Sequence, residues 1–246
     1  MTVIAVYSVK GGVGKTTLAV DFAWRCASVS GHRTQIWDLD PQGGSGYLLD
    51  KEPPSRARAI SVFGNDGKPR KLITASRYPN LDMLPGDISL CEMPVQLVRI
   101  VARKRISKIC RSLSSDYDRI IRDCPPMMNE VSNQIIRAAD VIVLPLPPSP
   151  LSARAMAQVR AELARHDRHP PVLPVLSMYD TRRRLHREAR EGFAQGWPVI
   201  PASTWGEQAA ARRAPVPTFA NWSDTSKGME RLWTAVERKL EEMGQS

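Results

Sequence analysis

The chain has 246 residues, enough for one α/β domain with a sizeable core, and we expect residues 1–246 to form a single domain. Its net charge of +10 favours a polyanionic partner such as nucleic acid or an acidic membrane face, and this excess lies in residues 51–111 and 151–246, whereas residues 1–50 are neutral. No run approaches the ~18–20 apolar residues of a membrane-spanning helix and no signal peptide can be read, so we expect a soluble, cytoplasmic protein.

A glycine-rich segment at residues 9–17 joins the first predicted strand to the first predicted helix. The apolar run at 3–7 has the length and β-branched content of a buried strand, and the apolar spacing over 18–24 is helical. Such a turn leaves backbone N–H groups free at the positive end of the helix dipole. Lys15 adds a full charge, and Thr16 offers a hydroxyl suited to Mg²⁺. The segment therefore predicts a phosphate cradle for a nucleoside triphosphate, in preference to a flexible turn with a surface lysine. The residues expected to hold the nucleotide are Lys10, Gly11, Gly12, Val13, Gly14, Lys15, Thr16 and Thr17.

The later elements alternate between strands and helices. Predicted strands lie at 34–37, 81–84, 120–121, 141–144 and 172–176. Predicted helices lie at 92–113, 151–166, 182–194 and 223–243, and 43–80 is expected to hold loops and a short helix. This alternation is typical of an α/β fold with a doubly wound, mostly parallel sheet and helices on both faces. Pro174 favours an irregular or edge position for its strand, because proline lacks the N–H of a ladder bond.

Acidic side chains follow two of the predicted strands. Asp38 and Asp40 end the strand at 34–37, and Asp123 follows the strand at 120–121. Ligands of parallel sheets bind outside the carboxyl ends of the strands, where Lys15 also falls. Asp123 is suited to hold Mg²⁺ through a water molecule, and Asp40 to position or activate an attacking water. The alternative for each aspartate is a hydrogen bond within a turn.

The four cysteines show no spacing typical of a metal site or a redox motif. They are Cys26, Cys91, Cys110 and Cys124. We expect buried, reduced thiols.

Three motifs carry a resemblance to a known family. Lys10-Gly-Gly-Val-Gly-Lys-Thr, Asp38-Leu-Asp-Pro-Gln and Asp123-Cys-Pro-Pro resemble the deviant Walker A, Walker A′ and Walker B motifs of the ParA/MinD ATPases. The strict P-loop pattern has glycine where Val9 stands, and the deviant form has the lysine that follows it. The likeness continues at 80–86, 139–145, 178–182 and 199–216, so it covers nearly the full length. It is closest to the ParA branch, which acts in DNA partition and cargo positioning.

The resemblance implies a P-loop ATPase that uses ATP and Mg²⁺ and forms an ATP-sandwich homodimer. Lys10 would reach the nucleotide of the partner subunit, Lys15 would bind the phosphates, and Asp40 would be the catalytic aspartate. The implied Mg²⁺ residues are Thr16, Asp123 and Asp40, and Asp180 and Pro201 are implied to contact the nucleotide. Hydrolysis in the family is weak until a partner protein, ParB-like or a cargo adaptor, stimulates it. A cation supplied in trans would stabilise the charge of the transition state, which couples dimerisation to catalysis.

The chain departs from the family pattern in three ways. Arg122 replaces an apolar residue in the strand before Asp123. Ala202 and Trp205 stand where some members carry DNA-contacting arginines. No long segment precedes the ATPase core, so we expect no helix-turn-helix autoregulatory domain.

Other basic segments remain candidates for sequence-independent DNA contacts, which are salt-sensitive. The candidate residues are Arg182, Arg183, Arg184, Arg187, Arg190, Arg212 and Arg213. A third candidate is the basic side of the helix predicted at 92–113, with Arg99, Arg103, Lys104, Lys108 and Arg111. The alternative for each is a solvated helix face.

The predicted C-terminal helix has an apolar stripe that invites comparison with the membrane-attaching helix of MinD-like proteins. The stripe consists of Met229, Leu232, Trp233, Val236, Leu240 and Met243. Glu237, Glu241 and Glu242 crowd its end, where a membrane helix would carry lysines. We therefore expect this helix to pack on the core and expect no membrane partner.

The leading functional hypothesis is a nucleoid-associated ATPase that segregates a plasmid or chromosome by cycling between an ATP-bound, DNA-binding dimer and a free monomer. The alternative within the same chemistry is the positioning of a protein cargo, such as a chemoreceptor cluster or a microcompartment. A metabolic P-loop enzyme is disfavoured because no second polar constellation for a substrate is visible. A reductase of the nitrogenase iron-protein kind would need cysteines that bridge a cluster across the dimer, and Cys124 alone gives little support for this. An ATP switch on a membrane is disfavoured by the C-terminal helix.

Overall fold

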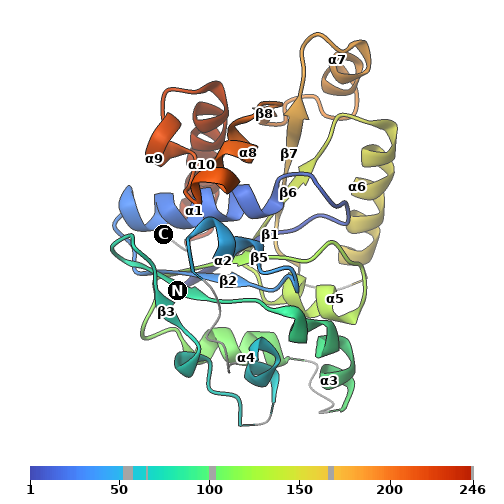
Figure 1. Cartoon of the computed structure of the whole chain (residues 1–246). Helices are drawn as coiled ribbons and strands as arrows, with labels where there is room; N and C mark the ends of the chain where they lie inside the picture. Colours follow the sequence, from blue (N-terminus) through green and yellow to red (C-terminus); the bar gives the residue numbers. More distant parts are fainter. Residues whose placement is uncertain (52–57, 65, 100–103, 166–168, 245–246) are drawn as a thin grey trace.

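In a computed structural model of the chain, the described residues are 1–51, 58–64, 66–99, 104–165 and 169–244. Within them, eight strands form one sheet in the order β3-β4-β2-β5-β1-β6-β7-β8 (Figure 1). The strands are β1 (Thr2–Val6), β2 (Thr34–Asp38), β3 (Thr74–Ala75), β4 (Leu81–Leu84), β5 (Arg119–Asp123), β6 (Val141–Leu146), β7 (Val172–Tyr179) and β8 (Val199–Pro201). Every pair is parallel except β3 with β4, which confirms the doubly wound, mostly parallel α/β fold.

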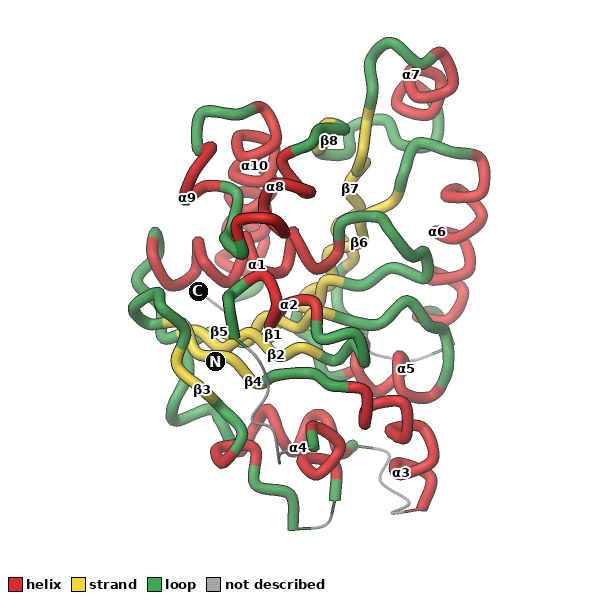
Figure 2. Tube along the Cα trace, viewed as in Figure 1, coloured by secondary structure: helices red, strands yellow, loops and turns green. Residues whose placement is uncertain are grey.

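The helices cover both faces of this sheet (Figure 2). The α-helices are α1 (Lys15–Ser28), α2 (Gly44–Leu48), α3 (Met93–Arg99), α4 (Arg105–Ser112), α5 (Glu130–Arg137), α6 (Pro150–Leu163), α7 (Arg184–Glu191), α8 (Trp205–Arg212), α9 (Pro217–Ala220) and α10 (Asp224–Glu242). Three short 3₁₀ helices, η1 (Ala59–Phe63), η2 (Pro69–Lys71) and η3 (Ile88–Glu92), lie in the connections.

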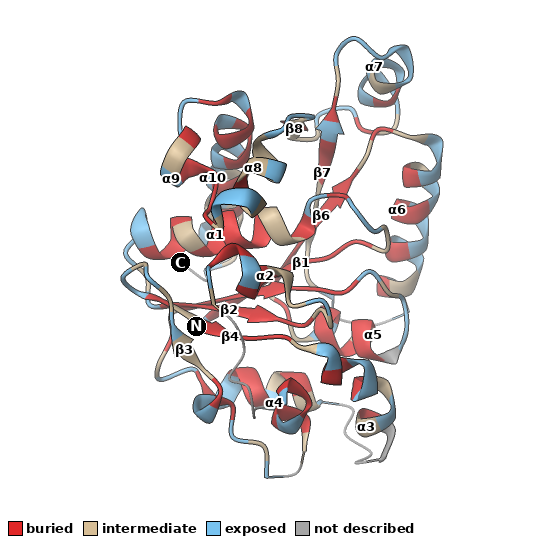
Figure 3. Cartoon of the chain, in the orientation of Figure 1, coloured by how far each residue is buried: buried red, intermediate tan, exposed pale blue. Residues whose placement is uncertain are grey.

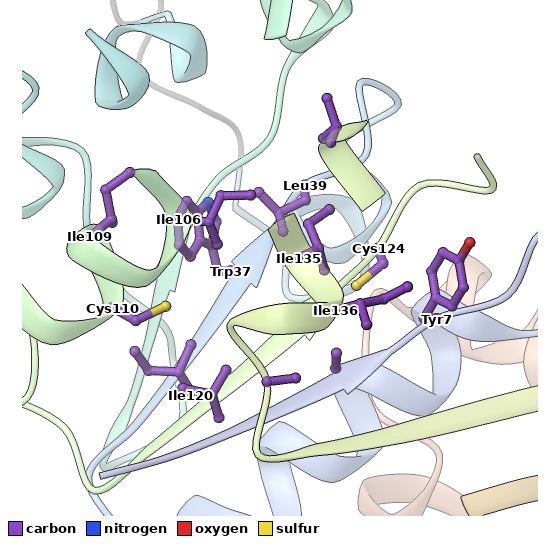
Figure 4. Packing of buried hydrophobic residues seen from close by; sticks show 14 of the residues in the cluster. Tyr7, Trp37, Leu39, Ile106, Ile109, Cys110, Ile120, Cys124, Ile135 and Ile136 are labelled. Atoms are coloured by element: carbon purple, nitrogen blue, oxygen red, sulfur yellow. The ribbon is translucent and has the colours of Figure 1, made fainter. Parts of the chain in front are cut away.

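Two large hydrophobic clusters fill most of the space between the sheet and its helices, and a third, small one in the described part of the chain consists of Leu176, Tyr179 and Ala194. Alternate residues of β1 belong to different clusters: Val3 and Ala5 face one, Ile4 and Val6 the other. The first cluster includes side chains of α3, α4, α5 and α6, and part of it is seen in Figure 4. The second joins α1, α8, α9 and α10. Burial of both faces of the strands explains their nearly continuous apolar runs (Figure 3).

The single helix predicted over 92–113 is wrong. The structure describes α3 and α4 as separate helices, and Lys104 before α4 has φ −131° and ψ 24°, outside the helical region. Ile106, Ile109 and Leu113 are buried as expected. The side chains of Val98 and Arg99, and residues Val101 and Arg103, lie outside the described part.

Pro174 lies in an interior strand, because β7 pairs with both β6 and β8. The backbone N–H of Leu176 donates to the carbonyl oxygen of Pro198 at 2.9 Å, and pairing with β8 begins at Leu176. The backbone of Pro174, two residues earlier, faces the same side of β7, where β8 has not yet begun. The N–H that proline lacks would therefore have had no partner in the sheet. The predicted edge position is thus wrong for the strand, whereas the alternative of an irregular strand agrees with the register shift in its pairing with β8 between Leu176 and Tyr179.

Three cysteines, Cys26, Cys110 and Cys124, are buried free thiols as expected, but Cys91 is exposed. It lies in η3, where the chain runs along the surface before α3.

The C-terminal helix packs on the core as predicted. Met229, Leu232, Trp233, Val236 and Leu240 of α10 are buried in the second cluster, and the Trp233 ring meets Phe22 of α1 edge-on at 5.3 Å. No helix in the described part of the chain is long and apolar enough to cross a membrane.

Arg122 has a fully buried side chain in the centre of the sheet. Its guanidinium donates to the carbonyl oxygen of Ile135 at 2.8 Å and also to that of Ala138, both at the C-terminal turn of α5. These carbonyls have no intrahelical donor of their own, and the helix dipole places negative charge there. The charged residue therefore ties β5 to the end of α5 in place of the usual apolar contact.

Replacement of Arg122 by alanine is expected to destabilise the protein by about 4 kcal/mol, because it leaves both a cavity and unpaired buried carbonyls. Arg122→Met fills most of the volume without donors and should cost about 2 kcal/mol. Urea unfolding monitored by circular dichroism would give both values. A methionine variant as stable as the parent would show that the hydrogen bonds to α5 contribute nothing.

Candidate functional site

The glycine-rich loop runs from the end of β1 to the start of α1, as predicted. Gly12 has φ 69° and Gly14 φ 82°, so both occupy the left-handed region that other residues adopt only with strain. No atom outside the neighbouring residues lies within 4 Å of a Cβ built at Gly11, Gly12 or Gly14. The concave side of the loop is therefore open, and its glycines are required by backbone conformation and not by crowding.

Lys15 is the first residue of α1, and its side chain is only 7% exposed. The Nζ atom donates to the backbone oxygen of Lys10 at 2.9 Å, so the ammonium lies against the loop itself. Burial lowers the pKa of Lys15, while the carboxylates of Asp123 and Asp40 oppose that shift. The loop, the lysine and the two aspartates predicted from the sequence therefore lie together.

Asp38 and Asp123 are buried side by side at the carboxyl ends of β2 and β5, where they are register partners. Asp38 accepts hydrogen bonds from the backbone N–H groups of Asp40 at 3.0 Å and Ser45 at 2.9 Å. Burial raises the pKa of Asp38 well above its usual value, and the neighbouring Asp123 raises it further. Asp38 thus holds the backbone that follows β2.

Ser45 was not singled out by the sequence analysis, yet it bridges the two aspartates. Its N–H donates to Asp38, and its hydroxyl donates to Oδ2 of Asp123 at 2.9 Å. Ser45 is fully buried at the start of α2. A serine within a run of glycines carries no spacing signal, so only the folded chain reveals this contact.

Asp123 has the features expected of a carboxylate that holds a metal cation. Burial raises its pKa to about 6, although hydrogen bonds from Thr16 and Ser45 oppose the shift. Its Oδ1 atom is buried and has no hydrogen-bond partner in the described part of the chain. With the hydroxyl of Thr16 beside it, this oxygen donor set fits Mg²⁺, a hard cation that keeps several waters. No group of three or more His, Cys, Asp or Glu side chains among the described residues forms a metal cage, as expected where phosphate and water supply most ligands.

Asp40 is half-buried, and its Oδ1 atom accepts from the backbone N–H of Gln42 at 3.0 Å. The turn after β4 packs closely against the backbone of Asp40, since a Cβ built at Gly86 would lie 2.7 Å from the backbone oxygen of Asp40. The turn hydrogen bond considered from the sequence is therefore present. Among the described residues none donates to the second carboxylate oxygen, which can therefore accept from a water molecule.

Lys10 directs its ammonium toward its own chain in this structure. The Nζ atom donates to Oγ of Ser149 at 3.2 Å and to Oγ of Ser152 at 3.1 Å, at the start of α6. Sequence reasoning missed both serines, which are 139 and 142 residues away. Contact with a partner subunit would require Lys10 to leave these hydroxyls.

A pocket adjoins the loop on the side of α1 and β8. Val13, Thr17 and Pro201 line it, as expected for residues near a bound nucleotide, together with Ala202. Asp180 is not among the described residues that line this pocket. Its carboxylate pairs instead with Arg182 at 3.0 Å and with Arg183 at 3.6 Å, and the Arg182 hydrogen bond holds its pKa at about 2.

The candidate DNA-contacting arginines lie on the surface, each with an intramolecular contact. In the 182–190 segment, Arg184 pairs with Glu188 at 2.7 Å, Arg187 donates to the backbone oxygen of Thr181 at 2.7 Å, and Arg190 lies over the Tyr179 ring. Figure 1 shows α7 projecting from the end of β7, away from α8 and α9.

The second arginine pair sits at the end of α8. Arg213 pairs with Asp50 at 2.9 Å, and Arg212 lies over the Phe219 ring at 5.0 Å. Trp205, which replaces an arginine of the family pattern, meets Trp222 edge-on at 5.3 Å. An aromatic contact thus stands where the resemblance leads us to expect an arginine.

Comparison with known proteins supports the resemblance drawn from the motifs. A family model described as "AAA domain" matches residues 1–169. Sporulation initiation inhibitor protein Soj of Bacillus subtilis is 32% identical over 147 residues, which are 58% of this chain and 57% of Soj, so the chain spans just over half the length of that relative. Chromosome partitioning protein ParA of Myxococcus xanthus is 29% identical over 196 residues, 77% of this chain and 69% of ParA.

The fold is also found among solved structures. The ATP complex of McdA from Cyanothece superposes with a TM-score of 0.83 at 20% identity, and 96% of each chain is covered. At that identity the likeness shows the fold alone. The family-model match over residues 1–169, together with three motifs gathered at one edge of the sheet, establishes that the chain belongs to the ParA/MinD family of P-loop ATPases and is similar to its ParA branch.

Proposed function

We propose that residues 1–246 act as one ATPase domain that binds ATP and Mg²⁺, dimerises on ATP, binds DNA without sequence preference and thereby segregates a plasmid or chromosome. The observation that carries this proposal is the convergence of Lys15, Thr16, Asp40 and Asp123 on one open glycine loop. Membership of a family that includes chromosome partitioning proteins supports the biological role.

Nucleotide binding rests on the loop and the start of α1. The N–H groups of the loop and of the first helical turn face the phosphates, and Lys15 leaves the backbone oxygen of Lys10 to neutralise them. Thr16 and Asp123 would hold Mg²⁺, which supplies further neutralisation of phosphate charge when bound. Pro201 and the pocket beside Thr17 would take the base.

Hydrolysis rests on Asp40 and Lys10. Asp40 would orient the attacking water with the carboxylate oxygen that its turn leaves available. Lys10 would leave the two serine hydroxyls of its own chain and contact the phosphates of the nucleotide bound to the partner subunit. This contact is stronger because it is charge-assisted. This exchange would make dimerisation depend on ATP, and a stimulating protein, ParB-like or a cargo adaptor, would then reset the cycle.

The arginines of the 182–190 segment are the leading DNA contacts, with Arg212 and Arg213 as a second group. Their present ion pairs are exposed, and an exposed pair is screened by solvent, so a phosphate can replace the carboxylate. DNA binding would keep the protein on the nucleoid within the cytoplasm. An ATPase that positions a protein cargo would use the same site and differ only in the partner that stimulates it.

DNA binding is expected only with ATP, and the logarithm of its binding constant should fall linearly with the logarithm of salt concentration. Replacement of Arg184 and Arg187 by alanine should lower the slope by about one for each lost phosphate contact. The matched control is Arg160→Ala with Arg165→Ala, two exposed arginines of or next to α6. Fluorescence anisotropy with a random duplex, in ATP, ADP or no nucleotide, measures both effects. Absence of binding under every condition would refute the DNA-based cycle.

A further inference from the structure

A second cavity lies at the amino ends of the central strands, whereas the glycine loop lies at their carboxyl ends. It has a volume of about 720 Å³, and Val3 of β1, α4 and the segment 134–140 line it. Val3 and Asp140 mark the amino ends of β1 and β6, and the Val3 N–H donates to Oδ2 of Asp140 at 2.7 Å. The glycine loop follows the carboxyl end of β1, so the two sites are separated by the length of the strand. We call this space the α4–α5 cavity.

The α4–α5 cavity is lined by more positive than negative charge. Lys104, Arg111 and Arg137 line it, and the single carboxylate among its described lining residues is that of Asp140, which already accepts from the Val3 N–H. Lys104 and Arg111 are exposed and take part in no ion pair in the described part of the chain. The cavity therefore has the electrostatic character of an anion site.

The position and sequence of α4 explain why Lys104 and Arg111 line the cavity. Ser107 and Arg111 are four residues apart, which places them on one face of the helix, and Lys104 directly precedes its first residue. Ile106 and Ile109 are buried in the core on another face, where Figure 4 shows their packing. The core contacts of α4 thus fix the direction of its basic face.

Gln134 of α5 supplies an independent observation. Its side chain lines the cavity with an exposed fraction of only 4%, and its Oε1 atom is buried with no donor among the described residues. A buried acceptor without a partner costs about 1–3 kcal/mol, and native proteins seldom leave one unsatisfied. Oε1 is enclosed in this conformation, so a ligand hydroxyl can donate to it and remove this cost once the Gln134 side chain turns toward the cavity.

We propose that the α4–α5 cavity binds a small phosphorylated molecule that carries hydroxyl groups, such as a sugar phosphate. Its phosphate contacts Lys104 and Arg111, and one hydroxyl donates to Gln134. The volume lies within the range of about 300–1,000 Å³ typical of small-molecule sites. Neither the glycine loop nor the ATPase cycle is needed for this binding, so the two proposals stand or fall separately.

Ribose 5-phosphate is the probe, and isothermal titration calorimetry is the measurement. Arg111→Ala should weaken its binding by roughly tenfold or more, the effect of one charge-assisted hydrogen bond. The matched control is Lys108→Ala, which removes an exposed cation of the same helix that does not line the cavity. Lys15→Ala should leave binding unchanged. Gln134→Leu should weaken binding of ribose 5-phosphate but not that of inorganic phosphate, a contrast that a general loss of structure cannot produce.

Three outcomes would overturn the proposal. Equal effects of Arg111→Ala and Lys108→Ala would show a diffuse charge effect. Loss of binding in Lys15→Ala would place the probe at the glycine loop. Loss of duplex DNA binding in Arg111→Ala, with no ribose 5-phosphate bound by the parent, would show that the basic face of α4 contacts DNA instead.

Discussion

Lys15→Ala is expected to weaken ATP binding by at least roughly 100-fold, as calorimetric titration with ATP and Mg²⁺ would show. The side chain is 7% exposed, so its ammonium meets phosphate in a largely dehydrated site where a charge-assisted hydrogen bond is strong. Loss of the ammonium also removes a cation whose charge lowers the pKa of Asp123, which makes the pocket more repellent to phosphate.

The matched control is Lys71→Ala, which removes an exposed lysine in η2, far along the chain from the glycine loop. It should bind ATP like the parent. Thermal unfolding of both variants tests whether they are folded. A folded Lys15→Ala protein with parental ATP affinity would show that the glycine loop does not hold the phosphates.

Asp40→Ala is expected to retain ATP binding but to lose hydrolysis by a factor on the order of 10² or more, the usual contribution of a positioned base. ATP should then accumulate on the protein and trap the dimer, visible by size-exclusion chromatography with light scattering. Asp40 is suited to the task because it is half-buried just after β2, next to the loop, and joins the Asp38–Ser45–Asp123 hydrogen-bond chain through its backbone N–H and not through its carboxylate.

Asp40→Asn separates a catalytic from a structural role. Asparagine can still accept the hydrogen bond from the N–H of Gln42, which closes the turn, but it cannot act as a base. If Asp40 accepts the proton of the attacking water, both variants lose hydrolysis. If it only closes the turn, Asp40→Asn hydrolyses ATP at the parental rate, and the assignment of the water-positioning residue fails.

The fold class followed from the sequence because its signals are local. The strands at 34–37 and 81–84 were predicted within a residue, because turn residues bound them: Gly31 precedes the first, and Pro85-Gly86 ends the second. The break between α3 and α4 was missed because the apolar spacing of 92–113 fits one helix equally well. Nothing in that spacing tells where the surrounding core requires the chain to turn.

For the site, the glycine loop, its lysine and the aspartates at the strand ends could be predicted from the residues alone, because parallel strands bring their carboxyl ends together whatever the loops do. The hydrogen-bond partners at the site could not. Packing brings Lys10 to Ser149 and Ser152 and places Ser45 between Asp38 and Asp123. It also pairs buried Arg122 with the end of α5, and Asp180 with two arginines. A turn or a strand is set by residues close together in the sequence, whereas a hydrogen-bond partner 139 residues away is fixed only when distant elements pack together.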